Sequence, residues 1–182
     1  GDTYTYRRLD RLKNEEERRV SFVAEVTANE VRYRGGRVTD LLGNVLQLAG
    51  GRVYSPNQLE PLDYVVGKQW VTHFRITTPK GRSGLNEMEL RIVAREKITV
   101  PAGTFNAFRI EGRGVFEMGQ GIVEVTNLTK WMAPDQVRRE IAMEETRERS
   151  GGGGGRRRTR PGGRGSKVVQ SVRWELLSFK QS

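Results

Sequence analysis

The chain contains no cysteine, a single histidine and no long hydrophobic run. The absence of cysteine excludes a disulfide framework, a thiolate metal site and a cysteine nucleophile. A single histidine also argues against zinc, because zinc sites usually take more than one histidine or cysteine ligand. A membrane-spanning helix needs about 20 mostly apolar residues, and no stretch of the chain provides them. We therefore expect neither a metal nor a cofactor, and no transmembrane segment.

The 182 residues carry a net charge of +10, and half of that excess lies in one short segment. Residues 151–165 contain only glycine, arginine, threonine and proline. Glycine-rich chain is flexible, and like charges repel, so we expect a flexible loop over residues 150–166 at the tip of the last hairpin. The candidate anion-binding residues are its five arginines, Arg156, Arg157, Arg158, Arg160 and Arg164.

Three interpretations of this Arg/Gly segment remain open. Arginine and glycine tracts bind nucleic acid through phosphates and through stacking on bases. No phenylalanine or tyrosine is interleaved here, which makes nucleic acid the weakest of the three. An anionic surface, such as lipid headgroups or an acidic partner protein, is the second interpretation. The third is an insertion that is merely tolerated at a loop tip.

Apolar and polar residues alternate along most of the chain. Residues 20–28, 70–77, 88–95 and 172–176 all follow this period of two, which is typical of strands with one buried and one solvated face. Glycine-rich turns separate the runs. The pattern predicts a single all-β domain over residues 1–182, with about nine antiparallel strands packed as a sandwich or a partly open barrel. The charged segment 11–19 lacks an apolar stripe, so we expect a loop there and not a helix.

The segment 98–110 predicts a tight hairpin. Pro101 presets one turn residue and Gly103 can adopt positive φ. After the turn, Phe105 and Ala107 alternate out of phase with Phe108 and Ile110. A similar break occurs at Leu176 and Leu177 in the last strand. Each break indicates either a β-bulge or a strand buried on both faces.

Candidate catalytic groups are few. His73 is the only side chain that could act as the base of a Ser-His-Asp triad, and no G-x-S-x-G motif accompanies it. By alternation it shares a face with Val71 and Arg75, which favours a strand histidine facing water. The acidic clusters at 15–17 and 144–145 are interleaved with arginines, which favours an ion-paired surface. We therefore expect no enzyme, and a hydrolase on a β scaffold is the least favoured alternative.

Three tryptophans, Trp70, Trp131 and Trp174, lie in strand-like segments. Aromatic side chains at such positions usually fill the core, where each buries about 200 Å². If the sheet curls into an open barrel, the same residues can line a ligand cavity. They are the candidate ligand-binding residues of the sequence.

Four motifs occur in order along the chain: Gly67-Lys-Gln-Trp70, Glu96-Lys-Ile-Thr-Val-Pro-Ala-Gly-Thr-Phe105, Trp131-Met-Ala-Pro134 and Glu175-Leu-Leu-Ser-Phe179. Together they resemble an uncharacterised family of exported bacterial β-domains of unknown function, with the pattern G-x-x-W, V-P-A-G-T-F, W-[YF]-A-P and E-L-x-x-[FY]. Met132 stands where the family has an aromatic residue. The resemblance covers about residues 60–182. It implies an all-β fold and export to the periplasm or cell surface, and it implies no activity.

These observations predict a non-catalytic envelope protein. We expect a binding or structural module whose partner is an apolar ligand, an anionic lipid or another envelope protein, and we do not expect nucleic acid. The chain opens Gly1-Asp2-Thr3-Tyr4 without a methionine. We therefore expect a processed chain that lacks its signal segment.

Overall fold

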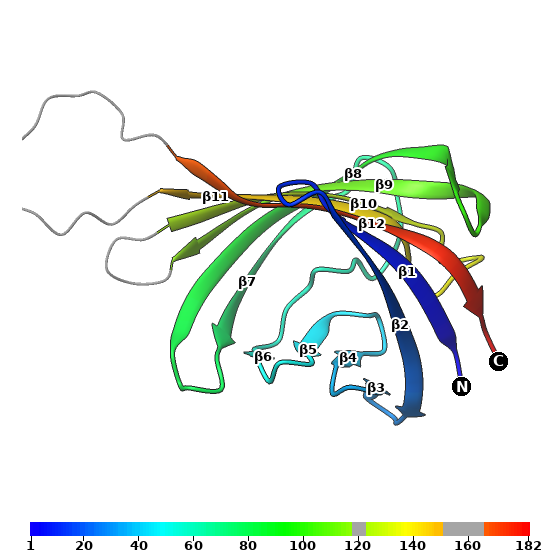
Figure 1. Ribbon diagram of the computed structural model, residues 1–182, viewed down its shortest axis with the longest axis horizontal. Helices are drawn as coiled ribbons and strands as arrows, with labels where there is room; N and C mark the ends of the chain where they lie inside the picture. Colours follow the sequence, from blue (N-terminus) through cyan, green and yellow to red (C-terminus); the bar gives the residue numbers. More distant parts are fainter. Residues whose placement is uncertain (118–122, 151–165) are drawn as a thin grey trace, which may run out of the picture.

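The strands of the computed structural model form a closed antiparallel barrel (Figure 1). The structure describes residues 1–117, 123–150 and 166–182. Within these ranges twelve strands follow one another around the barrel in chain order, and β1 pairs with both β2 and β12 to close it. The strands are β1 (Thr3–Asp10), β2 (Glu15–Val26), β3 (Glu30–Tyr33), β4 (Val38–Asp40), β5 (Val45–Gln47), β6 (Val53–Tyr54), β7 (Gln69–Thr77), β8 (Ser83–Val100), β9 (Gly103–Glu117), β10 (Val123–Met132), β11 (Glu140–Ser150) and β12 (Lys167–Lys180).

The prediction of an all-β antiparallel fold is confirmed, but the sandwich of about nine strands is wrong. The additional strands are β3 to β6, which are only two to four residues long. A strand this short shows no period-two pattern, so the segment looks like a series of turns in the sequence. The charged segment 11–19 is a turn only as far as Asn14, and β2 begins at Glu15. The described residues contain no helix long and apolar enough to cross a membrane.

The predicted hairpin at Pro101–Gly103 is present. Val100 pairs with Gly103, and Gly103 has a φ of 138°, in the region that favours glycine. Both register breaks are also explained. Phe105 belongs to one core cluster and Phe108 to the other, so β9 is buried on both faces. In β12 the register shifts at Leu177, which is a β-bulge.

We expect Gly103→Val to lower the melting temperature. A side chain at this φ costs about 1–3 kcal/mol of strain, and each kcal/mol shifts the melting temperature of a chain this size by about 2–4 °C. Gly50→Val is the matched control, because Gly50 lies in a turn without positive φ and has no neighbour within 4 Å of an added Cβ. Thermal unfolding of both variants checks this. Equal melting temperatures would remove the strain assignment.

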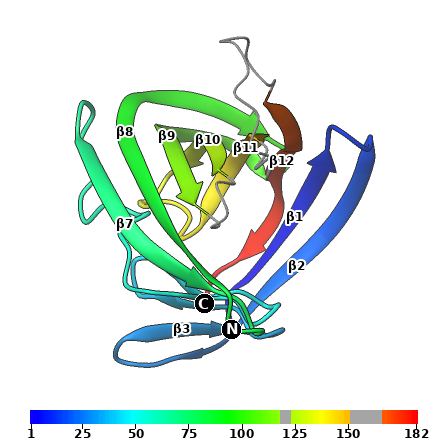
Figure 2. The same cartoon turned by 90° about the vertical axis from the view of Figure 1, so that its left-hand side faces the viewer.

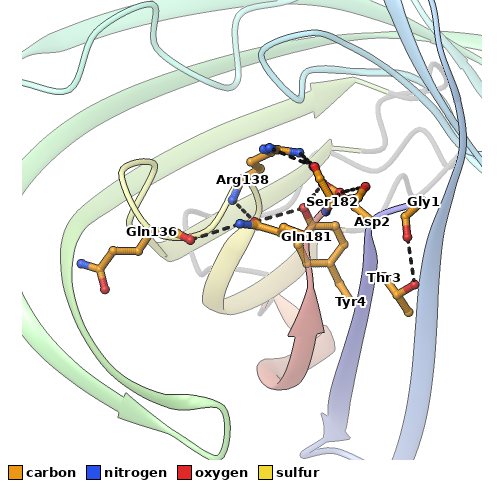
Figure 3. Close-up of polar contacts among 8 residues, drawn as sticks. All are labelled: Gly1, Asp2, Thr3, Tyr4, Gln136, Arg138, Gln181 and Ser182. Atoms are coloured by element: carbon orange, nitrogen blue, oxygen red, sulfur yellow. Dashed lines mark hydrogen bonds and ion pairs between the residues drawn. The ribbon is translucent and has the colours of Figure 1, made fainter.

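The two ends of the chain meet in a polar clasp at one end of the barrel (Figure 3). Asp2 accepts hydrogen bonds from the backbone N–H of Ser182 (2.9 Å) and from the Tyr4 hydroxyl (2.9 Å), and it pairs with Arg138 (2.9 Å). Burial would raise the pKa of Asp2, but these bonds outweigh it and lower that pKa. Tyr4 is buried, and burial followed by the Asp2 contact raises its pKa. The clasp ties the outer ends of β1 and β12 together.

Candidate binding site in the barrel interior

The interior face of the sheet is identified by contacts that cross the barrel. Lys130 on β10 donates to the Leu59 carbonyl oxygen (2.9 Å), which lies in the segment between β6 and β7. Tyr54 on β6 shares this face with Phe74 on the adjacent strand β7, because their rings stack with centroids 5.8 Å apart. The charge of Arg147, on β11, acts on the Tyr54 hydroxyl although four strands separate β6 from β11 along the sheet. Side chains in register with these residues therefore face inward.

One side of the interior is formed by β7 to β9 (Figure 2). Its inward side chains are apolar and tightly packed. Phe74, Met88 and Leu90 are all buried. Two glycines of β9 make this packing close: a Cβ at Gly112 would lie 2.9 Å from the Leu90 side chain, and one at Gly114 would lie 3.0 Å from Met88. The neighbouring side chains therefore lie flat on the sheet and form a smooth apolar wall.

The opposite side, formed by β1, β2, β11 and β12, is charged and reached by water. Arg19 and Arg147 face inward, yet their side chains are 56% and 36% exposed. Glu145 pairs with Arg147 (2.9 Å) and accepts a hydrogen bond from Gln170 (2.6 Å). Inward-facing groups can keep this exposure only if solvent enters the barrel. The interior is thus apolar on one side and polar on the other.

At the base of the interior lies a group of buried charges, which we call the base cluster: Arg37, Glu60, Lys130, Arg139 and Glu140. Lys130 and Glu60 form an ion pair in which the Lys130 side chain is only 6% exposed. The Tyr64 hydroxyl also donates to Glu60 (3.4 Å). The turn between β4 and β5 positions Glu60, because the backbone N–H of Glu60 donates to the side-chain oxygen of Asn44 in that turn (2.7 Å).

Arg139 and Glu140 form the second pair of the base cluster. Arg139 Nε lies 3.6 Å from Glu140 Oε2, and the Arg139 side chain is 7% exposed. Burial alone would raise the pKa of Glu140, but the charges of Arg139 and Arg37 outweigh it and lower that pKa to about 2. Burial would lower the pKa of Arg139, but Glu140 and nearby tyrosine hydroxyls raise it instead. Tyr6 donates to the Glu140 carbonyl oxygen (3.0 Å).

Arg37 is the third cation of the cluster and differs from the other two. Its guanidinium lies 5.6 Å from the centre of the Tyr33 ring, and that of Arg139 lies 5.1 Å from the same ring. Its Nε, like that of Arg139, is buried without a hydrogen-bond partner. Within the described residues its side chain forms no ion pair. Burial and then the Arg139 charge lower its pKa. Two like charges therefore share one aromatic ring.

The three tryptophans named by the sequence do not form one wall. Trp70 and Trp174 share the inward face, whereas Trp131 follows the inward-facing Lys130 and points outward. Trp70 donates to the Gln58 carbonyl oxygen (2.7 Å) and packs on the apolar side. Trp174 lies between Arg8 and Arg19, each 5.7 Å from its ring centre. Their role in ligand binding stays a prediction.

The outward Trp131 joins three of the four sequence motifs. Its indole N–H donates to Glu96 (2.9 Å), the first residue of the hairpin motif. Arg173 lies 5.9 Å from its ring centre and also pairs with Glu175 of the last motif (2.7 Å). The hairpin tip reaches the same strand, where the Ala102 N–H donates to the Leu176 carbonyl oxygen (3.1 Å). These motif residues hold strands together and carry no candidate chemistry.

Of the other candidate groups, His73 lies on the outer surface and the acidic clusters form ion pairs. His73 is 68% exposed, and its Nε2 lies 2.8 Å from Glu87 Oε2, which agrees with a strand histidine facing water. Of the acidic clusters, Glu144 pairs with Arg11 (2.9 Å) and Arg173, and Glu17 pairs with Arg19 (2.9 Å). Within the described ranges, no group of three or more histidine, aspartate or glutamate side chains could hold a metal.

The five arginines of the Arg/Gly segment lie outside the described residues. β11 ends at Ser150 and β12 begins at Lys167, and these two strands pair, so the segment does connect the last hairpin. If it binds anions, removing residues 151–165 should abolish retention on heparin at low salt, because five arginines that contact sulfate or phosphate groups make binding strongly salt-dependent. Unchanged retention would leave the tolerated insertion as the explanation.

Comparison with solved structures places the fold. One is a "putative exported protein with YmcC-like fold" from Bacteroides fragilis NCTC 9343, which is 10% identical, with a TM-score of 0.57 over 100% of this chain and 96% of that one. Another is a "putative lipoprotein" from Parabacteroides distasonis ATCC 8503, which is 13% identical, with a TM-score of 0.51 over 99% and 95% of the two chains. Both share the fold of this chain. No family model and no curated protein sequence matches it.

Sequence reasoning missed the whole base cluster. One of its residues left a signal: Lys130 stands between Leu128 and Met132, at a position where alternation expects an apolar side chain. Arg37 lies in a glycine-rich turn and Arg139 lies in a loop, where arginine is ordinarily solvated. No local pattern marks either of them as buried.

Proposed function

We propose that the protein is an exported, non-catalytic binding module that holds an amphiphilic ligand inside its barrel. The supporting observation is the division of the interior. The wall around Phe74, Met88 and Leu90 is apolar, whereas Arg19 and Arg147 opposite it are charged and wet. A ligand with an acyl chain and a polar head satisfies both sides at once, because neither group is then left against an unsuitable surface.

Two further observations support export and the absence of catalysis. The solved structures that share the fold are described as an exported protein and a lipoprotein. The sequence motifs resemble those of exported bacterial β-domains. The single histidine of the chain, His73, pairs with a surface carboxylate outside the barrel, so it forms no Ser-His-Asp triad there. We place the protein in the periplasm or at the cell surface.

Titration with soluble amphiphiles tests this proposal. Lauric acid and dodecyl phosphate, below their micelle concentrations, should produce a saturable change in tryptophan fluorescence. Trp174 faces the interior and Trp131 faces outward, so the two provide a matched pair. We expect the change to be smaller in Trp174→Phe and in Trp70→Phe, which each remove an inward tryptophan, and to be unchanged in Trp131→Phe. The proposal fails if neither amphiphile binds, or if only Trp131→Phe loses the signal.

A further inference from the structure

The base cluster carries one more positive charge than it can pair internally. Its cations are Arg37, Lys130 and Arg139, and its carboxylates are Glu60 and Glu140. Lys130 is paired with Glu60, and Arg139 is paired with Glu140. Arg37 forms no ion pair within the described residues, and the charges that act on it are those of Arg139 and of Glu140, which is already paired with Arg139. Arg37 is half-buried and its Nε is fully buried, and a charge held in such a place without an ion-pair partner is destabilising, which points to a use for it.

The inward position of Arg37 contrasts with that of a second arginine in the same turn. Arg34 and Arg37 occupy the same four-residue turn between β3 and β4. Arg34 is exposed and lies over the ring of Phe22 at 4.2 Å, as expected for an arginine in a surface turn. Arg37 instead lies partly buried beside Tyr33, and its charge reaches Tyr54, the aromatic residue stacked on the apolar wall. Its inward position is therefore not required by the turn itself.

The chemistry of the two guanidiniums indicates what would balance them. A guanidinium presents a planar fork of N–H donors that matches the oxygens of a carboxylate or phosphate. Arg37 and Arg139 approach the same aromatic ring, Tyr33, at 5.6 Å and 5.1 Å from its centre, and the charge of Arg139 acts on Arg37. The Nε of Arg37 is buried and lacks an acceptor. An oxyanion is the group that would supply the missing acceptor and the missing charge.

We propose that Arg37 and Arg139 form an oxyanion site at the base of the barrel, which binds the carboxylate or phosphate of the ligand. The site deepens the proposed function and rests on it, because it orients an amphiphile with its head at the base cluster. The acyl chain then extends past Tyr54 and Phe74 along the apolar wall. Lys130 is not part of the site, since Glu60 and the Leu59 carbonyl already occupy it.

Calorimetric titration of the wild type and of three variants tests the site. The probes are dodecyl phosphate, lauric acid at pH 8, uncharged dodecanol and inorganic phosphate. Arg37→Met should weaken binding of both anionic amphiphiles by about tenfold or more, as expected for loss of a charged hydrogen bond. Arg37→Lys should recover part of this loss, because it keeps the charge without the fork. Arg34→Met, from the same turn, should bind all probes like the wild type.

Dodecanol separates the head-group site from the apolar wall. Its affinity should be the same in the wild type and in Arg37→Met. The inference is overturned if Arg37→Met binds the anionic amphiphiles as tightly as the wild type does. It is also overturned if Arg37→Met weakens the binding of dodecanol as much as that of the anionic amphiphiles. The same holds if Arg34→Met weakens binding of the anionic amphiphiles as much as Arg37→Met does.

Thermal unfolding in inorganic phosphate distinguishes this inference from the proposed function. A ligand that binds only the folded state raises the melting temperature. Phosphate should therefore raise it for the wild type and for Arg34→Met, and not for Arg37→Met. If this holds while no amphiphile binds, the oxyanion site stands and the amphiphile function falls. If the amphiphiles bind without any dependence on Arg37, the function stands and the site falls. If phosphate and the amphiphiles all leave the protein unchanged, both are overturned.

Discussion

Glu140→Gln should lower the free energy of unfolding at pH 7 by about 3 kcal/mol. Removing one partner of a buried ion pair typically costs about 3–5 kcal/mol, because the other charge stays buried and uncompensated. Here Arg139 and Arg37 would both remain beside the neutral amide. Glu89→Gln is the control, because Glu89 is exposed on the outer surface of β8. Urea unfolding of the three proteins measures the difference.

The effect of Glu140→Gln should depend on pH in a defined direction. The pKa of Glu140 is lowered to about 2 in the folded protein, from 4.5. A lowered carboxylate pKa stabilises the fold above the unfolded pKa, and the stabilisation is lost as pH falls toward the folded pKa. The gap between the wild type and Glu140→Gln should therefore be full at pH 7 and should shrink between about pH 5 and pH 2. If the difference in free energy of unfolding stayed constant across this range, the stabilisation of the Glu140 carboxylate by the charges of Arg139 and Arg37 would be contradicted.

Trp131→Ala should destabilise the protein by about 3 kcal/mol, the lower end of the range for losing a packed tryptophan. The side chain joins β10 to the β8–β9 hairpin through Glu96 and to β12 through Arg173. Trp131→Phe keeps most of the apolar area and loses the N–H donor. It should therefore cost less, about 1.5–3 kcal/mol for a hydrogen bond to a charged acceptor.

A double-mutant cycle isolates the contact between Trp131 and Glu96. In a Glu96→Ala background the indole N–H has already lost its acceptor, so Trp131→Phe should be less costly there. Denaturant unfolding of the four proteins gives the coupling energy. An identical cost of Trp131→Phe in both backgrounds would show that the hydrogen bond contributes nothing, and that the packing of the ring is its whole role.

The local pattern of the chain predicts most of the strands, but it does not predict whether the sheet closes into a barrel. Alternation identifies β2, β7, β8 and β12, and Pro101 with Gly103 identifies the turn between β8 and β9. A sandwich and a barrel can be built from the same strands. The difference lies in the pairing of β1 with β12, which joins residues at opposite ends of the chain. The alternation within one strand carries no information about a partner at the other end of the chain, so the closure of the barrel could not be predicted from it.

The same limit applies to the candidate site. Trp131 and Trp174 both occur in alternating strands, and only the register of β10, β11 and β12 shows that they lie on opposite faces. The surrounding sequence does not distinguish Arg37 from Arg34, because the two arginines flank the same pair of glycines, although their side chains lie in different environments. Lys130 is the exception, because it interrupts an apolar row within a single strand. Burial of charge is otherwise a property of the assembled barrel.

Closure through β1 and β12 also determines the order in which the barrel can be completed. β1 pairs on one edge with β2, the next strand of the chain, yet its other edge has no partner until β12 has been synthesised. Pairings between distant parts of a chain form slowly, and an unpaired strand edge is a site of aggregation. A chain that lacks β12 would expose the free edges of β1 and β11 together. Removal of this one strand, Lys167–Lys180, should therefore turn a closed barrel into an open sheet that aggregates.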